Sequence, residues 1–185
     1  MRLFPDIVYS DLYRSNGKKG AWNLLCTAIR KVDFRWIVLF RVYQGKKSHF
    51  LTRWLLRRYS LKTGIQIGWK AKIGEGLVLV HCGDIAVNNE VIIGKNCTLY
   101  RGVTVGMEFR GKRKGNPTIG DNVWIGSNAC VVGNVRIGDD VLIAPLSFVN
   151  FDVPSHSIVL GNPARIIPRE KATKSYITHT DYPEK

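Results

Sequence analysis

The chain has 185 residues, 45% of them hydrophobic, which is enough for one domain or one domain with an appendage. Four cysteines without a CxxC pair indicate neither a disulfide framework nor a zinc cluster. The formal net charge of +14 lies mainly in the first third: residues 1–62 hold 14 Lys and Arg against three acids, whereas residues 63–185 hold 14 against 11. This basic region favours either an anionic partner or a merely solvated surface.

Residues 1–63 are predicted to form a basic α-helical segment. Apolar residues recur there at three- and four-residue spacing, as in helices with one apolar face: Trp22, Leu25, Ile29, Val32 and Trp36. The longest charge-free apolar run, Trp36 to Phe40, is far shorter than the ~20 residues of a membrane span. We expect this segment to cap the structure that follows, with peripheral contact to an anionic membrane surface as an addition.

No signal peptide is expected, because acids stand within the first eleven residues and no apolar run accompanies them. The sequence therefore predicts a cytoplasmic protein, with the inner membrane face as the place of any peripheral contact. Nucleic acid is not expected as a partner, because charge alone, without a recognised motif, is a weak indication.

Residues 64–167 are organised by a six-residue repeat. A branched or long aliphatic residue returns at every sixth position in the best-preserved part: Ile119, Ile125, Val131, Ile137, Ile143 and Val149. Six is a multiple of two and not of 3.6, so the period is typical of strands and turns. A hexapeptide period predicts a mainly β fold, a parallel β-helix in which neighbouring coils bury the aliphatic anchors.

The repeat is interrupted twice. It slips by two residues between Ile85 and Ile93, and a larger gap with eight extra residues separates Val105 from Ile119. The inserted segment, residues 107–116, contains glycine and four basic residues. We expect a projecting loop there, because insertions in solenoids gather on one face that often binds ligands.

Residues 64–167 resemble the left-handed β-helix acyltransferases. The resemblance rests on the hexapeptide rhythm, the extended loop after Val103-Thr104-Val105-Gly106, the run from Ile119 to Gly126, and the closing Gly161-Asn162-Pro163-Ala164-Arg165. Beyond this closing sequence, residues 168–185 are expected to be a polar tail. The arrangement is most similar to serine acetyltransferases and to O-acetyltransferases of bacterial capsular and exopolysaccharides. The resemblance implies a left-handed helix and a homotrimer that uses acetyl-CoA, and no metal, at active sites between subunits.

His81 is the candidate catalytic residue. It follows an apolar strand in Leu79-Val80-His81-Cys82-Gly83, the place of the catalytic His in the serine acetyltransferase pattern. Independently, an alcohol is a weak nucleophile toward a thioester at pH 7 and needs a base near neutrality, which imidazole supplies. The other histidines fit less well, because they lie in the helical segment, the closing turn and the tail: His49, His156 and His179.

The expected mechanism is direct transfer in a ternary complex. His81 takes the proton of the acceptor hydroxyl as its oxygen attacks the acetyl carbonyl, and main-chain N–H groups stabilise the oxyanion. Cys82 is a conceivable nucleophile, but strand neighbours point to opposite faces, so we expect no covalent acetyl-enzyme.

Three positions depart from the serine enzymes. The Asp that orients the catalytic His in those enzymes falls on Gln66, and the acid that precedes this His falls on Val80. A second His near the end of the loop is replaced at Asn116-Pro117. A neutral amide accepts a hydrogen bond from imidazole but does not stabilise imidazolium by charge. The departures favour a sugar hydroxyl of a capsular or exopolysaccharide, or of its precursor, over serine. Candidate substrate-binding residues are Asp84, Arg110 and Asn116.

The resemblance also places acetyl-CoA along the outside of the coils. Carried over singly, Gly106 and Ser127 contact its thioester end, and Pro145 and Asn150 border its pantetheine arm. Arg165 meets phosphate, an assignment with physical support because guanidinium matches phosphate in geometry and charge.

Three other functions remain open. A serine O-acetyltransferase is the runner-up, and comparing L-serine with sugar acceptors separates the two. A carbonic anhydrase needs three histidines around zinc, and only His81 lies on the coils. A non-catalytic β-helix scaffold would fail to bind acetyl-CoA.

Overall fold

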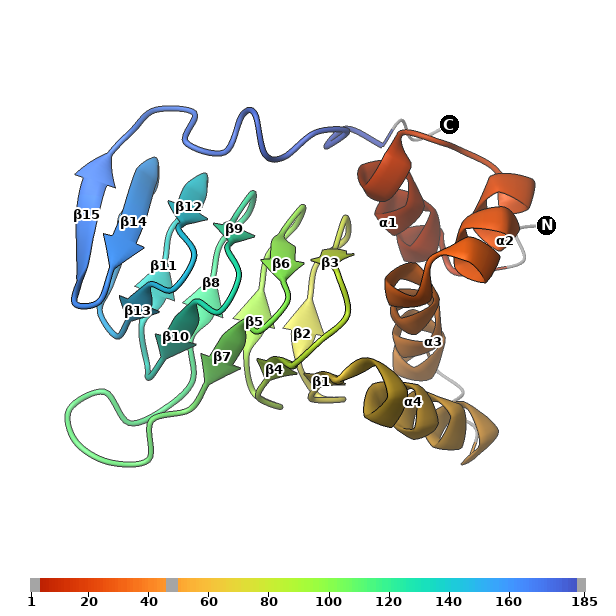
Figure 1. Cartoon of the computed structure of the whole chain (residues 1–185), viewed down its shortest axis with the longest axis horizontal. Helices are drawn as coiled ribbons and strands as arrows, with labels where there is room; N and C mark the ends of the chain where they lie inside the picture. The colour runs from red at the N-terminus through yellow and green to blue at the C-terminus, as the bar shows by residue number, and fades with distance from the viewer. Residues whose placement is uncertain (1–3, 46–49, 183–185) are drawn as a thin grey trace.

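A computed structural model describes residues 4–45 and 50–182 as helices followed by a solenoid of short strands (Figure 1). The helices are α1 (Asp6–Asn16), α2 (Ala21–Arg30), α3 (Val32–Gln44) and α4 (Phe50–Thr63). They gather at one end of the solenoid, and α4 leads directly into its first strand. No helix in the described part is long and apolar enough to cross a membrane.

The strands form three sheets, one on each side of the solenoid. Sheet A contains β1 (Ile65–Ile67), β4 (Ile85–Val87), β7 (Thr104–Gly106), β10 (Cys130–Val132) and β13 (Phe148–Val149). Sheet B contains β2 (Lys72–Ile73), β5 (Ile92–Ile93), β8 (Thr118–Ile119) and β11 (Arg136–Ile137). Sheet C contains β3 (Val78–Val80), β6 (Thr98–Tyr100), β9 (Trp124–Ile125), β12 (Val141–Ile143), β14 (Ser157–Gly161) and β15 (Ala164–Pro168).

Successive coils add parallel strands to each sheet, and the antiparallel hairpin of β14 and β15 ends the stack. The predicted fold, mainly β with a left-handed parallel β-helix after an α-helical segment, is confirmed.

The hexapeptide anchors line the interior of the solenoid, as predicted. Each of the six anchors between residues 119 and 149 is at most 3% exposed, and neighbouring coils align them in register, as with Ile119 and Ile137. The residues four positions later are also buried: Val123, Ala129, Val135, Val141 and Ser147. Two inward positions in each six-residue unit therefore make one continuous apolar core.

The two-residue slip lies earlier than the sequence predicts. Val87, not Ile85, is the register partner of Ile67, so eight residues separate the anchors Leu79 and Val87. The extra residues belong to the turn 81–84, between β3 and β4. The repeat alone predicts the wrong place for the slip because Ile85 looks like an anchor. Ile85 is buried, but it occupies the second inward position of its coil.

The eight-residue insertion forms the predicted projecting loop. Residues 107–116 leave the solenoid between β7 and β8 (Figure 1). Glu108 and Gly115 form an isolated antiparallel bridge that closes the base of the loop, with both backbone N···O distances at 3.0 Å. The side chain of Phe109, directly after this bridge, is exposed.

The helices cap the open end of the solenoid. Trp36, Ile37 and Phe40 from α3 and Leu56 from α4 belong to the same apolar cluster as the coil anchors. They cover the apolar interior at the first coil, which would otherwise face water. The capping role expected for this segment is confirmed.

A buried ion pair joins the cap to the first coil. Asp11 on α1 accepts hydrogen bonds from Arg41 Nε on α3 at 2.9 Å and from the Leu77 backbone N–H at 2.8 Å. Arg41 also donates to the backbone carbonyls of Ile73 at 2.7 Å and Gly74 at 2.6 Å. Both charged side chains are almost fully buried, so each needs these partners to offset its lost hydration.

The last part of the chain is not a free polar tail. After β15 it runs back along sheet C toward α1 (Figure 1). Ala172 and Ile177 are buried against Trp124 and Leu142, which point outward from sheet C. The sequence predicted only a polar tail here, and its packing on sheet C is visible only in the fold.

Candidate active site

Four of the ten candidate site residues lie on one edge of the solenoid, where the chain turns from sheet C to sheet A. We call this the C-to-A edge; it consists of the turns 81–84, 101–102, 127–128 and 145–146. His81 and Asp84 lie in the first turn, Ser127 in the third and Pro145 in the fourth. Strands of neighbouring coils are about 4.8 Å apart, so Ser127 lies roughly 10 Å and Pro145 roughly 14 Å along this edge from His81.

His81 occupies the lengthened turn and is exposed to solvent. Its φ of 60° lies in the left-handed region, which costs a residue with a Cβ some strain, and Asp84 in the same turn has a φ of 50°. Strained residues of this kind cluster at functional sites. The His81 ring packs edge-on against Tyr100 on the next coil, with centroids 6.4 Å apart.

Cys82 does not lie on a strand, contrary to the expectation that strand alternation separates it from His81; both belong to the turn after β3. Burial raises the pKa of the Cys82 thiol, and the nearby charge of Asp33 raises it further. The thiol therefore stays protonated near neutral pH, and the unreactive protonated form disfavours Cys82 as a nucleophile.

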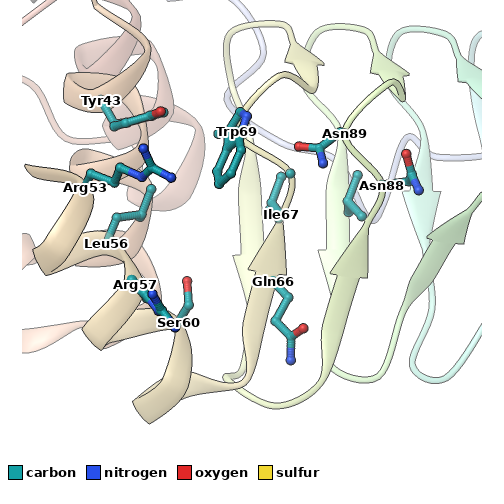
Figure 2. A pocket seen from close by; sticks show the side chains of 12 residues that line it. Tyr43, Arg53, Leu56, Arg57, Ser60, Gln66, Ile67, Trp69, Asn88 and Asn89 are labelled. Atoms are coloured by element: carbon teal, nitrogen blue, oxygen red, sulfur yellow. The ribbon is translucent and has the colours of Figure 1, made fainter. Parts of the chain in front are cut away.

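Gln66 lies in β1 and points outward from sheet A (Figure 2). Within the described residues, no hydrogen bond joins its amide to the His81 ring. The two residues lie at neighbouring coils, since Gln66 pairs in register with Ala86, five residues after His81.

The other candidates lie away from His81. Gly106, Arg110 and Asn116 belong to β7 and the projecting loop, and Asn150 follows β13, so all four stand near the edge where sheet A turns toward sheet B. The Asn116 amide N–H₂ donates to Glu90 Oε2 at 3.1 Å, while its buried Oδ1 has no partner among the described atoms. Arg165 is exposed in the final hairpin, on β15.

The remaining histidines have other surroundings. His156 Nδ1 lies 2.9 Å from Asp140 Oδ2 near the far end of the solenoid, and the His179 ring packs edge-on against Tyr13. His49 lies outside the described residues. Within the described part, no group of three His, Cys, Asp or Glu side chains is arranged to hold a metal ion.

Arg101 is a basic residue on the C-to-A edge that sequence analysis missed. Val80 and Tyr100 are register partners, so Arg101 stands one coil above His81, and its backbone N–H donates to the Val80 carbonyl at 3.1 Å. Its side chain is exposed beside the candidate base. The repeat aligns Leu79-Val80-His81 with Leu99-Tyr100-Arg101, and this alignment could have identified Arg101 from the sequence.

Known proteins share this architecture and sequence. Residues 116–150 match the family described as bacterial transferase hexapeptide (six repeats). A serine acetyltransferase of Synechococcus elongatus is 34% identical over 171 residues, which cover 90% of this chain and 68% of that protein. The chain belongs to the serine acetyltransferase-like hexapeptide transferases.

Solved structures of the same group superpose on this hexapeptide transferase. Serine acetyltransferase from Neisseria gonorrhoeae in complex with serine gives a TM-score of 0.67 at 32% identity, covering 88% of this chain and 68% of that one. The Brucella abortus enzyme in complex with coenzyme A gives 0.75 at 25% identity, covering 89% and 68%. This hexapeptide transferase is accordingly an acyltransferase, and its relatives support acetyl transfer in general.

Proposed function

We propose that the chain transfers an acetyl group from acetyl-CoA to a hydroxyl, with His81 as the general base. The observation that carries the proposal is an exposed imidazole held in a strained, lengthened turn on a hexapeptide-transferase solenoid. His81 takes the hydroxyl proton while the hydroxyl oxygen bonds to the acetyl carbon. The C–S bond of the thioester then breaks, and the imidazolium returns its proton to the CoA sulfur. Acetyl-CoA as co-substrate is supported by the Brucella relative that binds coenzyme A.

L-serine is the acceptor that the relatives support. The curated relatives and the superposed structures bear the name serine acetyltransferase, and one of the structures contains serine. The capsular or exopolysaccharide acceptor expected from the sequence has no such support among them.

A sugar hydroxyl is the second candidate because of three residues in this chain. Gln66, Val80 and Asn116 are uncharged where the serine enzymes carry acids and a second His. An amino acid bears a charged ammonium and carboxylate at pH 7, and leaving either without a partner costs binding energy. Neutral side chains suit a polyhydroxylated acceptor better.

An acceptor panel separates the two candidates. The purified chain is incubated with acetyl-CoA and either L-serine or oligosaccharides, and release of free thiol is followed together with the mass of the acceptor. O-acetylserine as the efficient product establishes the first candidate, and acetylated sugar with no acetylserine establishes the second. Failure to bind acetyl-CoA at all would overturn acetyl transfer and leave a non-catalytic scaffold.

A homotrimer with shared active sites is part of the proposal. His81 and Ser127 lie on one edge of sheet A, while Arg110 and Asn116 lie near the other, so a single chain leaves the candidate residues apart. A second copy that presents its projecting loop to the C-to-A edge would bring them together. Light scattering coupled to size exclusion measures the mass, and a monomeric active enzyme would refute the shared site.

A further inference from the structure

A groove separates α4 from the outer face of sheet A at the capped end of the solenoid. It has a volume of about 530 Å³, and Gln66 is among its lining residues. Figure 2 shows Arg53 and Arg57 approaching from α4, with Trp69 and Asn89 facing them from the first turns of the solenoid. We call this the α4 groove.

The α4 groove carries uncompensated positive charge. Arg53 and Arg57 line it, and no Asp or Glu is among its lining residues. Neither guanidinium has an acidic partner within the described part of the chain. The Arg53 guanidinium lies 4.9 Å from the Trp69 ring centre, a cation–π contact that restrains its position and leaves its N–H donors available.

The rest of the lining suits a sugar. Trp69 is 48% exposed, so its large apolar ring is left partly in water unless a ligand covers it. Tyr43 adds a second aromatic ring with a hydroxyl, and Asn88 and Asn89 add amide donors and acceptors. Aromatic surface beside neutral hydrogen-bonding groups matches the apolar faces and the hydroxyl edges of a pyranose ring.

We propose that the α4 groove binds an anionic sugar, one whose ring carries a carboxylate or a phosphate, as the distal part of the acceptor. Arg53 and Arg57 pair with the acidic group, and the Trp69 side of the groove receives the ring. This inference rests on the proposed acetyl transfer and favours its second acceptor class.

The position of the groove sets the size of the acceptor. Gln66 is in register with Ala86, two residues beyond the end of the His81 turn, which corresponds to roughly 7 Å along the strand. Trp69 lies three residues further, beyond the end of β1. An acceptor that reaches both His81 and Trp69 must therefore be longer than one amino acid, as an oligosaccharide or a glycosyl phosphate is.

The test measures binding without turnover. Isothermal titration of the full chain, with and without CoA, uses trigalacturonate and galactose 1-phosphate as anionic probes and maltotriose as a neutral probe. We expect an anionic probe to bind more tightly than maltotriose. The double variant Arg53→Gln/Arg57→Gln and the variant Trp69→Ala should each raise its Kd by about tenfold or more.

Arg58→Gln is the matched control, because Arg58 is exposed on the same helix, outside the groove and over Trp54. Its Kd should stay within about twofold of the wild type, since an exposed charge away from the ligand contributes little. Circular dichroism and size exclusion check that each variant keeps the fold and the assembly of the wild type.

The outcomes distinguish the groove from the proposed function. Binding of either anionic probe that weakens in the groove variants supports the proposal, and the better probe identifies the source of the charge. The proposal would be overturned if maltotriose bound as tightly as the anionic probes, or if no probe bound at millimolar concentration. It would also be overturned if the groove variants weakened CoA binding instead of probe binding. If the groove variants lost the assembly of the wild type, this surface would be an interface between subunits, and the proposal would be overturned. Anionic-probe binding without acetyl transfer would uphold the groove and refute the acceptor role.

Discussion

At the residue scale, the turn that carries His81 differs from the turns stacked on it. The next three turns each hold one residue at positive φ, namely Gly102, Asn128 and Leu146, whereas the His81 turn holds three, His81, Gly83 and Asp84. Histidine in the same region is strained, and two additional residues lengthen its turn. A fold that tolerates this strain presents the imidazole outward beside Tyr100, where an acceptor and a thioester can reach it.

His81→Ala should lower kcat by roughly 10²–10⁴-fold, the usual effect of removing a general base. Acetyl-CoA binding and the folded state should be unchanged, because the side chain is exposed. Steady-state kinetics with titration of CoA measure both.

Cys82→Ala, in the same turn, is the control and should keep near-normal turnover. A fully active His81→Ala enzyme would remove His81 from the mechanism, and an inactive Cys82→Ala enzyme would return the thiol to it.

Asp11→Asn should destabilise the chain by about 3–5 kcal/mol, because it leaves the buried Arg41 guanidinium without its counter-charge. Burial raises the pKa of Asp11, while Arg41 opposes that effect. Denaturant unfolding measures the free energy. The paired variant Asp11→Leu/Arg41→Met should be closer to the wild type, since both charges are gone. Equal destabilisation of the two would show that packing, not charge, dominates here.

At the scale of elements, Asp140 fastens the returning C-terminal segment to the solenoid. Its carboxylate accepts hydrogen bonds from the backbone N–H groups of Ala172 at 3.0 Å and Thr173 at 2.9 Å, and from the Thr173 hydroxyl at 2.7 Å. Burial alone would raise the pKa of Asp140, but hydrogen bonds from His156 and Thr173 outweigh it and lower that pKa. The hydrogen bond to Asp140 raises the pKa of His156 in turn.

The attachment of this segment should depend on pH in two directions. The folded pKa of Asp140 is depressed, so its contribution is present above about 3.9 and is lost as pH falls through the folded value. The folded pKa of His156 is raised, so its contribution is complete below about 6.5 and is lost as pH rises through the folded value. Amide exchange at Thr173, corrected for intrinsic rates, should be slowest between these limits; a flat profile would contradict the pairing.

Asp140→Ala should speed exchange at the Ala172 and Thr173 amides by about tenfold or more, since hydrogen bonds to a charged acceptor contribute about 1.5–3 kcal/mol. Glu170→Ala is the control, because Glu170 is exposed and lies 3.6 Å from His156 without bonding the segment. Unchanged exchange in Asp140→Ala would mean that burial of Ile177 alone holds the segment.

At the scale of the whole molecule, the cap leaves apolar side chains in water next to basic ones. Trp22 and Ile29 on α2 are exposed, as are Phe50 and Leu61 on α4. Both helices lie at the end of the molecule away from the final hairpin (Figure 1). Exposed bases flank the α2 pair: Lys18, Lys19, Arg30 and Lys31. Capping therefore does not use all of the apolar surface that the helices carry.

We expect the chain to bind vesicles that contain an anionic lipid at low salt and to release them at high salt, because each basic residue near the surface adds about 1 kcal/mol. Co-sedimentation measures the bound fraction. Trp22→Ser/Ile29→Ser should reduce it, and Phe109→Ser, in the projecting loop, should not. No sedimentation with anionic vesicles at low salt would leave the helices as a cap alone.

The repeat in the sequence determined the solenoid, the burial of its anchors and the eight-residue loop. These are local properties: alternation along a strand and a constant coil length set which residues point inward, wherever the coil lies in the molecule. The candidate base was also identifiable, since His81 follows a predicted strand and its residue type matches the chemistry.

Only the tertiary structure decided the features that join distant parts of the chain. The two-residue slip lies in the His81 turn, and only the pairing of Val87 with Ile67 on the neighbouring coil locates it there. Asp11 and Arg41 meet because two helices pack on the first coil, and the α4 groove exists because Arg53 faces Trp69 there. Such contacts follow no period in the sequence, so their partners are set by packing in three dimensions.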